Sequence, residues 1–173
     1  SIAGYNNIAA EWVIAVFMLL FGINFNLFFF MLIGRVRDVF KSEELKTYLI
    51  ICGVSTTAIA INTYHMFGNL PDTVRSSFFQ VTSIMSTTGF ATADFNLWPQ
   101  FSRSIIVILM FIGACAGSTA GGLKLSRVLI LIKSIVYEVR RMLRPNSVNV
   151  VKLDGEVVSN DTVHSATRYF VVY

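Results

Sequence analysis

The sequence predicts an all-α transmembrane protein: a helix–re-entrant loop–helix repeat with a broken second helix, followed by a small cytoplasmic β-hairpin. Three observations support this fold class. The 173 residues are 54% hydrophobic and 14% charged, whereas soluble domains carry about 25% charged residues. Several apolar runs reach the roughly 20 residues that a bilayer requires. Two further apolar runs stop at glycine-containing polar segments, which membrane proteins tolerate only beside protein or water.

Charge and cysteine content argue against several other classes. The net charge is +4, but the basic residues flank apolar runs, which is typical of cytoplasmic membrane borders and does not indicate nucleic-acid binding. Cys52 and Cys115 each lie inside an apolar run, and the sequence shows no Cys/His cluster of metal-site spacing. We therefore expect neither a disulfide framework nor a cysteine-ligated metal.

The first predicted unit, residues 1–34, contains one membrane span over residues 8–33. Asn24 and Asn26 fall within this span. Polar residues in membrane helices commonly form interhelical hydrogen bonds, so we favour that role over ion ligation. The basic segment over residues 35–44 is then predicted to be a cytoplasmic loop, because Lys and Arg are enriched on that side.

A complete repeat is predicted over residues 45–144, and its first helix, residues 45–67, returns the chain to the outer surface. His65 near the outer end of this helix is expected to be a structural, interfacial residue. The charge distribution agrees with this topology, because the predicted outer segment 68–103 carries only Arg75 and Arg103 as basic residues.

The middle of the repeat reads as a pore loop like that of potassium channels. A short helix is predicted over residues 72–86, too short to cross the bilayer, and it stops at the polar segment 87–92. In ion channels, such a helix points at a glycine-containing turn whose carbonyl oxygens replace the water around K⁺. The predicted ligands are the backbone carbonyl oxygens of Thr87, Thr88, Gly89 and Phe90. The ion is expected to be held at Thr88 and Gly89.

The second helix of the repeat, residues 102–144, is predicted to be broken by a non-helical intramembrane loop over residues 113–122. A continuous helix with a small-residue packing ridge is the first alternative, but the Gly121–Gly122 pair makes it costly. A phosphate-binding loop is excluded because Leu123 stands where that motif needs Lys.

A second function also fits part of this segment. Gly113-Ala-Cys-Ala-Gly117 matches the pattern of a nucleophile elbow, and His65 is available as a base. This alternative makes the protein an intramembrane hydrolase that uses Cys115 and His65. No third orienting residue is evident, so we favour the pore and expect no enzyme.

The last part of the chain changes in composition. Residues 145–162 contain the turn signal Asp154–Gly155 between two β-prone segments, which predicts a small cytoplasmic hairpin. A further membrane helix is predicted to start within residues 163–173.

Two motifs resemble one known family. STTGFATADF over residues 86–95, followed by GACAGSTAGGLK over residues 113–124, resembles the Trk/Ktr potassium transporter superfamily, specifically its TrkH-like pore-forming subunit. The resemblance covers essentially the whole chain. It implies four non-identical helix–pore loop–helix repeats around one K⁺ path. Residues 1–34 then resemble the second outer helix of repeat two, residues 45–144 resemble repeat three, and residues 163–173 begin repeat four.

The resemblance also implies site roles and partners. The Thr-Thr-Gly segment would supply one quarter of a selectivity filter, and the glycine-rich segment would be a loop that blocks the pore and moves in gating. It implies a homodimer in the lipid of the bacterial inner (plasma) membrane, a cytoplasmic TrkA-type nucleotide-binding regulatory subunit, and K⁺ as transported ion with no cofactor. Passive transport and Na⁺ or H⁺ symport stay open. The expected gate residues are Gly113, Gly117, Ser118, Thr119, Gly121, Gly122 and Lys124.

Two details of the expected gate loop can be stated in advance. The family often has Gly and Ser where this chain has Ala114 and Cys115, a departure that stiffens the start of the loop and keeps the glycine pair. The Lys124 ammonium can lie near the pore or extend to the inner membrane interface, and we favour the interface.

Overall fold

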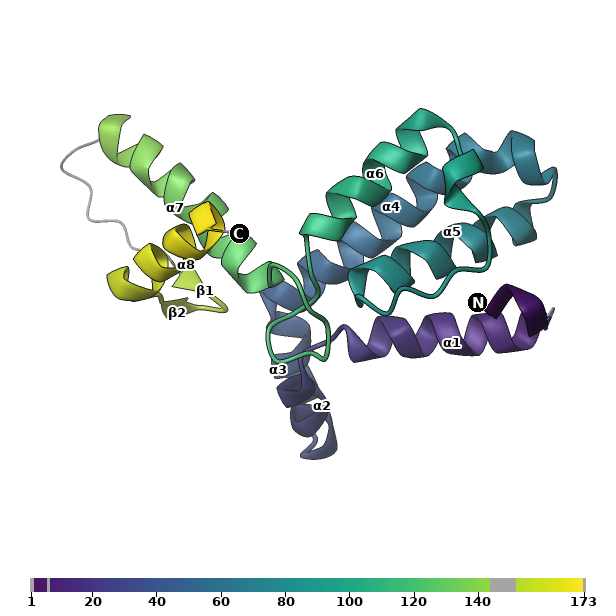
Figure 1. Cartoon of the computed structure of the whole chain (residues 1–173). Helices are drawn as coiled ribbons and strands as arrows, with labels where there is room; N and C mark the ends of the chain where they lie inside the picture. Colours follow the sequence, from purple (N-terminus) through teal and green to yellow (C-terminus); the bar gives the residue numbers. More distant parts are fainter. Residues whose placement is uncertain (1, 6, 144–151, 173) are drawn as a thin grey trace.

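The computed structural model describes residues 2–5, 7–143 and 152–172. Figure 1 shows α1, α4, α5 and α6 side by side, with α2 and α3 descending from one end of this group and α7 and α8 on the far side of a long loop. The elements are η1 Ile2–Tyr5, α1 Ile8–Phe21, α2 Phe25–Leu32, α3 Val36–Lys41, α4 Glu43–Phe67, α5 Leu70–Met85, η2 Phe95–Leu97, α6 Gln100–Phe111, α7 Leu125–Leu143, β1 Lys152–Leu153, β2 Glu156–Val157 and α8 Asn160–Val172.

Helix α5 lies at the centre of the packed group, in contact with α1, α4 and α6. It starts with Pro71 in its first turn, where the missing N–H of proline costs nothing. Phe79, Val81 and Met85 are fully buried. The short helix expected to be re-entrant is therefore enclosed by α1, α4 and α6, which fixes where its C-terminal end points.

The span expected over residues 8–33 is not one continuous helix. The chain bends by 93° between α1 and α2. Gly22 ends α1 at a place where a Cβ atom would lie 2.1 Å from the Tyr48 hydroxyl oxygen. The side chain of Asn24 then accepts a hydrogen bond from the backbone N–H of Asn26 and starts a new helix. Asn24 is thus a helix cap, and the expected interhelical role is not the one observed.

The segment expected to be a loop over residues 35–44 contains the short helix α3. Helices α4 and α5 begin slightly before the starts expected at residues 45 and 72, and α6 and α7 flank the break expected in the following helix. Among the described residues, α4 is the one continuous helix long and apolar enough to cross a membrane; the bent pair α1–α2 passes the same test when taken as one span.

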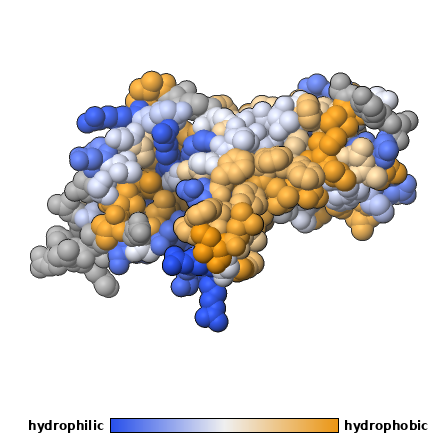
Figure 2. Space-filling model, turned by 90° about the horizontal axis from the view of Figure 1, so that it is seen from below, coloured by the Kyte–Doolittle hydropathy of each residue, from blue (hydrophilic) through white to orange (hydrophobic). Residues whose placement is uncertain are grey.

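The outer surface of α1 and α2 is apolar. Figure 2 shows hydrophobic side chains gathered over the middle and right of the lower face, where these two helices lie. Phe17, Phe21, Phe25 and Phe29 are between 45% and 60% exposed there. Such a surface suits contact with lipid or with neighbouring membrane helices.

Strands β1 and β2 pair antiparallel, with Lys152 opposite Val157 and Leu153 opposite Glu156. Asp154 and Gly155 connect them with φ angles of 52° and 85°, the left-handed conformations that a two-residue hairpin turn requires. The part of the expected hairpin before residue 152 lies outside the described residues. Helix α8 follows and packs against α7.

Candidate ion-conduction site

The turn after α5 is held by hydrogen bonds that run back into the helix. The backbone N–H of Thr87 donates to the Ile84 carbonyl oxygen at 3.0 Å, and the N–H groups of Thr88 and Gly89 donate to the Ser83 carbonyl oxygen at 2.9 and 3.4 Å. Thr87 and Gly89 have positive φ angles of 53° and 77°. The helix thus satisfies the N–H groups of Thr87, Thr88 and Gly89.

Three carbonyl oxygens of the turn have no hydrogen-bond partner among the described residues: those of Thr87, Thr88 and Gly89. The Phe90 carbonyl differs, because the Ser83 hydroxyl donates to it at 2.6 Å. All four residues are exposed on the surface of this chain. A row of unpaired, exposed carbonyls is the arrangement that a dehydrated cation needs, and the expectation of ligands here rests best on the first three.

The segment between α6 and α7 is closed at its neck. Ile112 and Leu123 form a parallel bridge, in which the Gly113 N–H donates to the Leu123 carbonyl oxygen at 2.8 Å. A Cβ atom at Gly113 would lie 2.4 Å from the carbonyl oxygen of Gly121. Only glycine fits this position, so the first glycine of the motif is required by the return of the chain beside it.

Backbone groups of the loop form hydrogen bonds with backbone groups at the break between α1 and α2. The Cys115 N–H donates to the Gly22 carbonyl oxygen at 3.1 Å, and the Phe25 N–H donates to the Gly117 carbonyl oxygen at 3.2 Å. Gly117 has a φ of 66° and packs against Asn24. Backbone groups freed by two interruptions thus pair with one another, which is how non-helical backbone is tolerated at membrane depth.

Glu44 holds the loop from a third element, and the sequence interpretation missed this role. Its side chain is buried, and its Oε1 atom accepts hydrogen bonds from the N–H groups of Ala116 at 2.7 Å and Ser126 at 3.0 Å. The preceding residue, Glu43, pairs with Lys133 instead. In the sequence, Glu43 and Glu44 are both acidic residues at the start of a helix, where negative charge is favourable, so no local signal distinguishes their roles.

The Lys124 ammonium is folded onto the loop, and its location relative to the inner membrane interface stays a prediction. Its Nζ atom donates to the Ser118 carbonyl oxygen at 3.3 Å and to the carbonyl oxygen of Ala120. Carbonyl oxygens that the non-helical backbone leaves without N–H partners thus accept hydrogen bonds from the cation.

The tip of the loop touches the turn. The Gly121 N–H donates to the Thr87 side-chain Oγ1 at 2.8 Å. The Thr119 hydroxyl lies 3.4 Å from the Phe21 carbonyl oxygen, and Gly122 has a φ of 74°. Two motifs separated by 34 residues in the sequence are therefore in direct contact.

A whole-chain comparison identifies the family. The model of the TrkH family, described as a cation transport protein, matches residues 1–173. The chain belongs to the TrkH family. The all-α transmembrane class is confirmed with it, as is the expected location as an integral protein of the bacterial inner membrane.

Individual relatives show the extent of the match. The Trk system potassium uptake proteins TrkH of Salmonella typhimurium and Escherichia coli K12 are 34% and 32% identical to this chain over 179 residues. The crystal structure of the potassium transporter TrkH from Vibrio parahaemolyticus matches with a TM-score of 0.89 at 28% identity, over 99% of this chain and 38% of that one. The matches to the two sequence relatives cover 100% of this chain and 36% of each relative, so this TrkH-family chain spans just over a third of their length.

The hydrolase alternative is not supported in this TrkH-family chain. Cys115 is fully buried, whereas His65 is exposed in the last turn of α4. Cys115 lies beside Ala116, whose N–H donates to Glu44 in the first turn of α4, whereas His65 is in the last turn of that helix. At about 1.5 Å per residue, roughly 30 Å of helix separates Glu44 from His65. The two residues of the elbow hypothesis do not meet.

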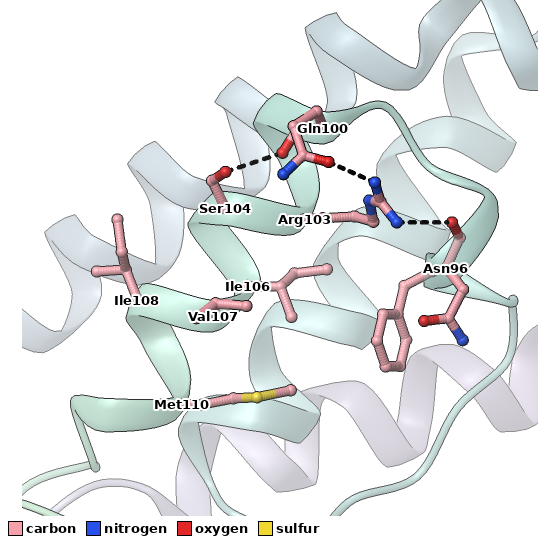
Figure 3. Close-up of a pocket in the computed structure, with 9 residues that line it drawn as sticks. Asn96, Gln100, Arg103, Ser104, Ile106, Val107, Ile108 and Met110 are labelled. Atoms are coloured by element: carbon pink, nitrogen blue, oxygen red, sulfur yellow. Dashed lines mark hydrogen bonds between the residues drawn. The ribbon is translucent and has the colours of Figure 1, made fainter.

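A pocket of about 580 Å³ lies along α6 and η2, apart from the turn and the loop (Figure 3). The Arg103 guanidinium at its polar end bonds the Gln100 side chain and reaches the Asn96 carbonyl oxygen at 3.5 Å. Ile106 and Met110 line its apolar end. No residue of the expected filter or gate lines this pocket, so it is not part of the candidate site.

Proposed function

We propose that residues 45–144 of this chain form the third of four helix–pore loop–helix repeats in a potassium uptake protein. The observation that carries the proposal is the turn after α5, with three carbonyl oxygens unpaired among the described residues: those of Thr87, Thr88 and Gly89. The relatives named as Trk system potassium uptake proteins support the choice of ion. In this assignment the chain supplies one quarter of a selectivity filter.

Selection of K⁺ in this proposal depends on replacing its hydration shell. The C-terminal end of α5 carries the negative end of the helix dipole, which favours a cation nearby. The carbonyl oxygens of Thr88 and Gly89 then act as the ligands contributed by this repeat, and equivalent groups of the other repeats complete the shell.

The loop over residues 113–122 acts as the gate below the filter. Its support is the contact between Gly121 and Thr87, which keeps the loop against the filter turn. Gly113, Gly117 and Gly122 give the loop its compact path, and the Lys124 ammonium donates hydrogen bonds to two carbonyl oxygens of the loop. An ion can pass when this loop moves aside.

We propose the assembly that family membership implies. The full-length protein is a homodimer in membrane lipid, regulated by a cytoplasmic TrkA-type nucleotide-binding subunit, and K⁺ is its transported ion, with no resident cofactor.

The test is K⁺ uptake by the full-length protein in a strain that cannot take up K⁺ otherwise. We expect growth at low K⁺ and measurable uptake, and a strain carrying the empty vector is the control. Varying Na⁺ and pH then separates a passive channel from Na⁺ or H⁺ symport. Absence of uptake by a correctly inserted protein would refute the proposed function.

A further inference from the structure

We propose that Glu44 is a positioning residue that latches the intramembrane loop closed. The inference rests on the proposed function, because it assigns a role in gating to a residue outside the loop. The buried Oε1 atom of Glu44 accepts one N–H from Ala116, inside the loop, and one from Ser126, in the first turn of α7. One carboxylate oxygen thus bridges the two sides of the loop neck.

This bridge opposes movement of the loop away from α7. The neck is closed by two hydrogen bonds, from the Gly113 N–H to the Leu123 carbonyl oxygen and from the Leu125 N–H to the Ala114 carbonyl oxygen, and Ala116 and Ser126 follow the two paired segments at the same end. If the loop swings away from the start of α7, Glu44 must lose at least one of its two hydrogen bonds. Opening therefore has to overcome a charge-assisted bond in a buried site, which is stronger than a bond between neutral groups.

The charge of Glu44 is balanced by backbone groups. Ser126 is in the first turn of α7, where the unpaired N–H groups and the helix dipole favour a negative charge. No ion pair involves Glu44 within residues 2–5, 7–143 and 152–172. Its carboxylate acts as a cap for α7 supplied by another helix, and it ties three elements together: α4, the loop and α7.

The latch also connects to the cytoplasmic hairpin. The Asp154 Oδ1 atom accepts the Glu43 N–H at 2.6 Å, and its Oδ2 atom lies 3.5 Å from the Ser42 hydroxyl. The hairpin turn therefore holds the first turn of α4 one residue away from Glu44. A displacement of the hairpin would shift the carboxylate relative to the loop.

The main experiment measures K⁺ flux through the purified full-length protein in liposomes, for wild type, Glu44→Gln and Glu44→Ala. Glu43→Gln is the matched control, because Glu43 is the neighbouring acid and bonds Lys133 rather than the loop. We expect a rise of about tenfold in basal flux for both Glu44 variants, with unchanged K⁺/Na⁺ selectivity. The reason is that these substitutions remove more hydrogen-bond stabilisation from the closed state than from the open state. Flux equal to that of Glu43→Gln would overturn the latch.

A second readout is independent of transport. A cysteine introduced by Ala120→Cys lies at a loop position that is buried when the loop is closed, so its rate of modification by a water-soluble thiol reagent reports loop opening. Cys52 and Cys115 are buried, and the protein without the added cysteine provides the background. We expect several-fold faster modification when Glu44→Gln is added.

The two readouts separate the two proposals. If the wild-type liposomes carry no K⁺ flux, the proposed function fails, and the modification rate still tests the latch. If wild type conducts K⁺ while Glu44→Gln leaves the modification rate of Ala120→Cys unchanged, the latch fails and the proposed function stands.

Discussion

Gly89 lies in the filter turn with a φ of 77°, a conformation that L-residues adopt at a cost of about 1–2 kcal/mol. Replacing it with serine in the full-length protein should distort the neighbouring carbonyl groups and admit more Na⁺ relative to K⁺. Gly68→Ser is the matched control, because Gly68 has a φ of 68° and open space around it, in the turn between α4 and α5. An unchanged K⁺/Na⁺ flux ratio in Gly89→Ser would contradict the filter assignment.

Gly113 is required by the closeness of the returning chain rather than by its own backbone angles. In Gly113→Ala, the added methyl group would meet the Gly121 carbonyl oxygen at 2.4 Å, so the neck must open. We expect a loss of about 1–3 kcal/mol in stability, seen as a lower melting temperature of the detergent-solubilised protein. Gly53→Ala in α4 meets no atom within 4 Å and should be neutral or stabilising. Equal melting temperatures for the two variants would argue against the tight neck.

At the scale of elements, the loop between α6 and α7 is the barrier in the proposed path. Removing residues 117–120 while keeping the bridge between Ile112 and Leu123 should raise K⁺ flux in liposomes, because less chain lies below the filter. The K⁺/Na⁺ ratio should change little, since the filter turn is left intact. A flux no higher than that of wild type would remove the gate role from this segment.

The elements also show what a local pattern can predict. Helix α5 and the interruption after α6 are close to the expected places, because proline, glycine and short apolar runs act within a few residues. The bend between α1 and α2 was not expected. At this bend the Tyr48 hydroxyl lies close to Gly22, and the sequence does not place these two residues together.

At the scale of the whole molecule, this chain holds only one quarter of the proposed filter. Three carbonyl oxygens from one turn cannot replace the full hydration shell of K⁺, so the isolated chain should not conduct. Purified residues 1–173 in liposomes should show no K⁺ flux above that of empty liposomes, whereas the full-length protein should. Selective flux through the isolated chain would require it to assemble a complete filter from copies of itself.

The sequence by itself determined the membrane class, the short buried helix and the glycine-rich interruption. Each of these follows from hydropathy or from backbone freedom, which are properties of neighbouring residues. Only the tertiary structure decided which acid holds the loop and where the Lys124 ammonium lies. Glu44 and Glu43 have the same chemistry and adjacent positions, yet burial against Ala116 and Ser126 makes one of them a bridge. That difference arises from hydrogen bonds between residues 72 and 82 positions apart in the sequence, which a local sequence pattern does not contain.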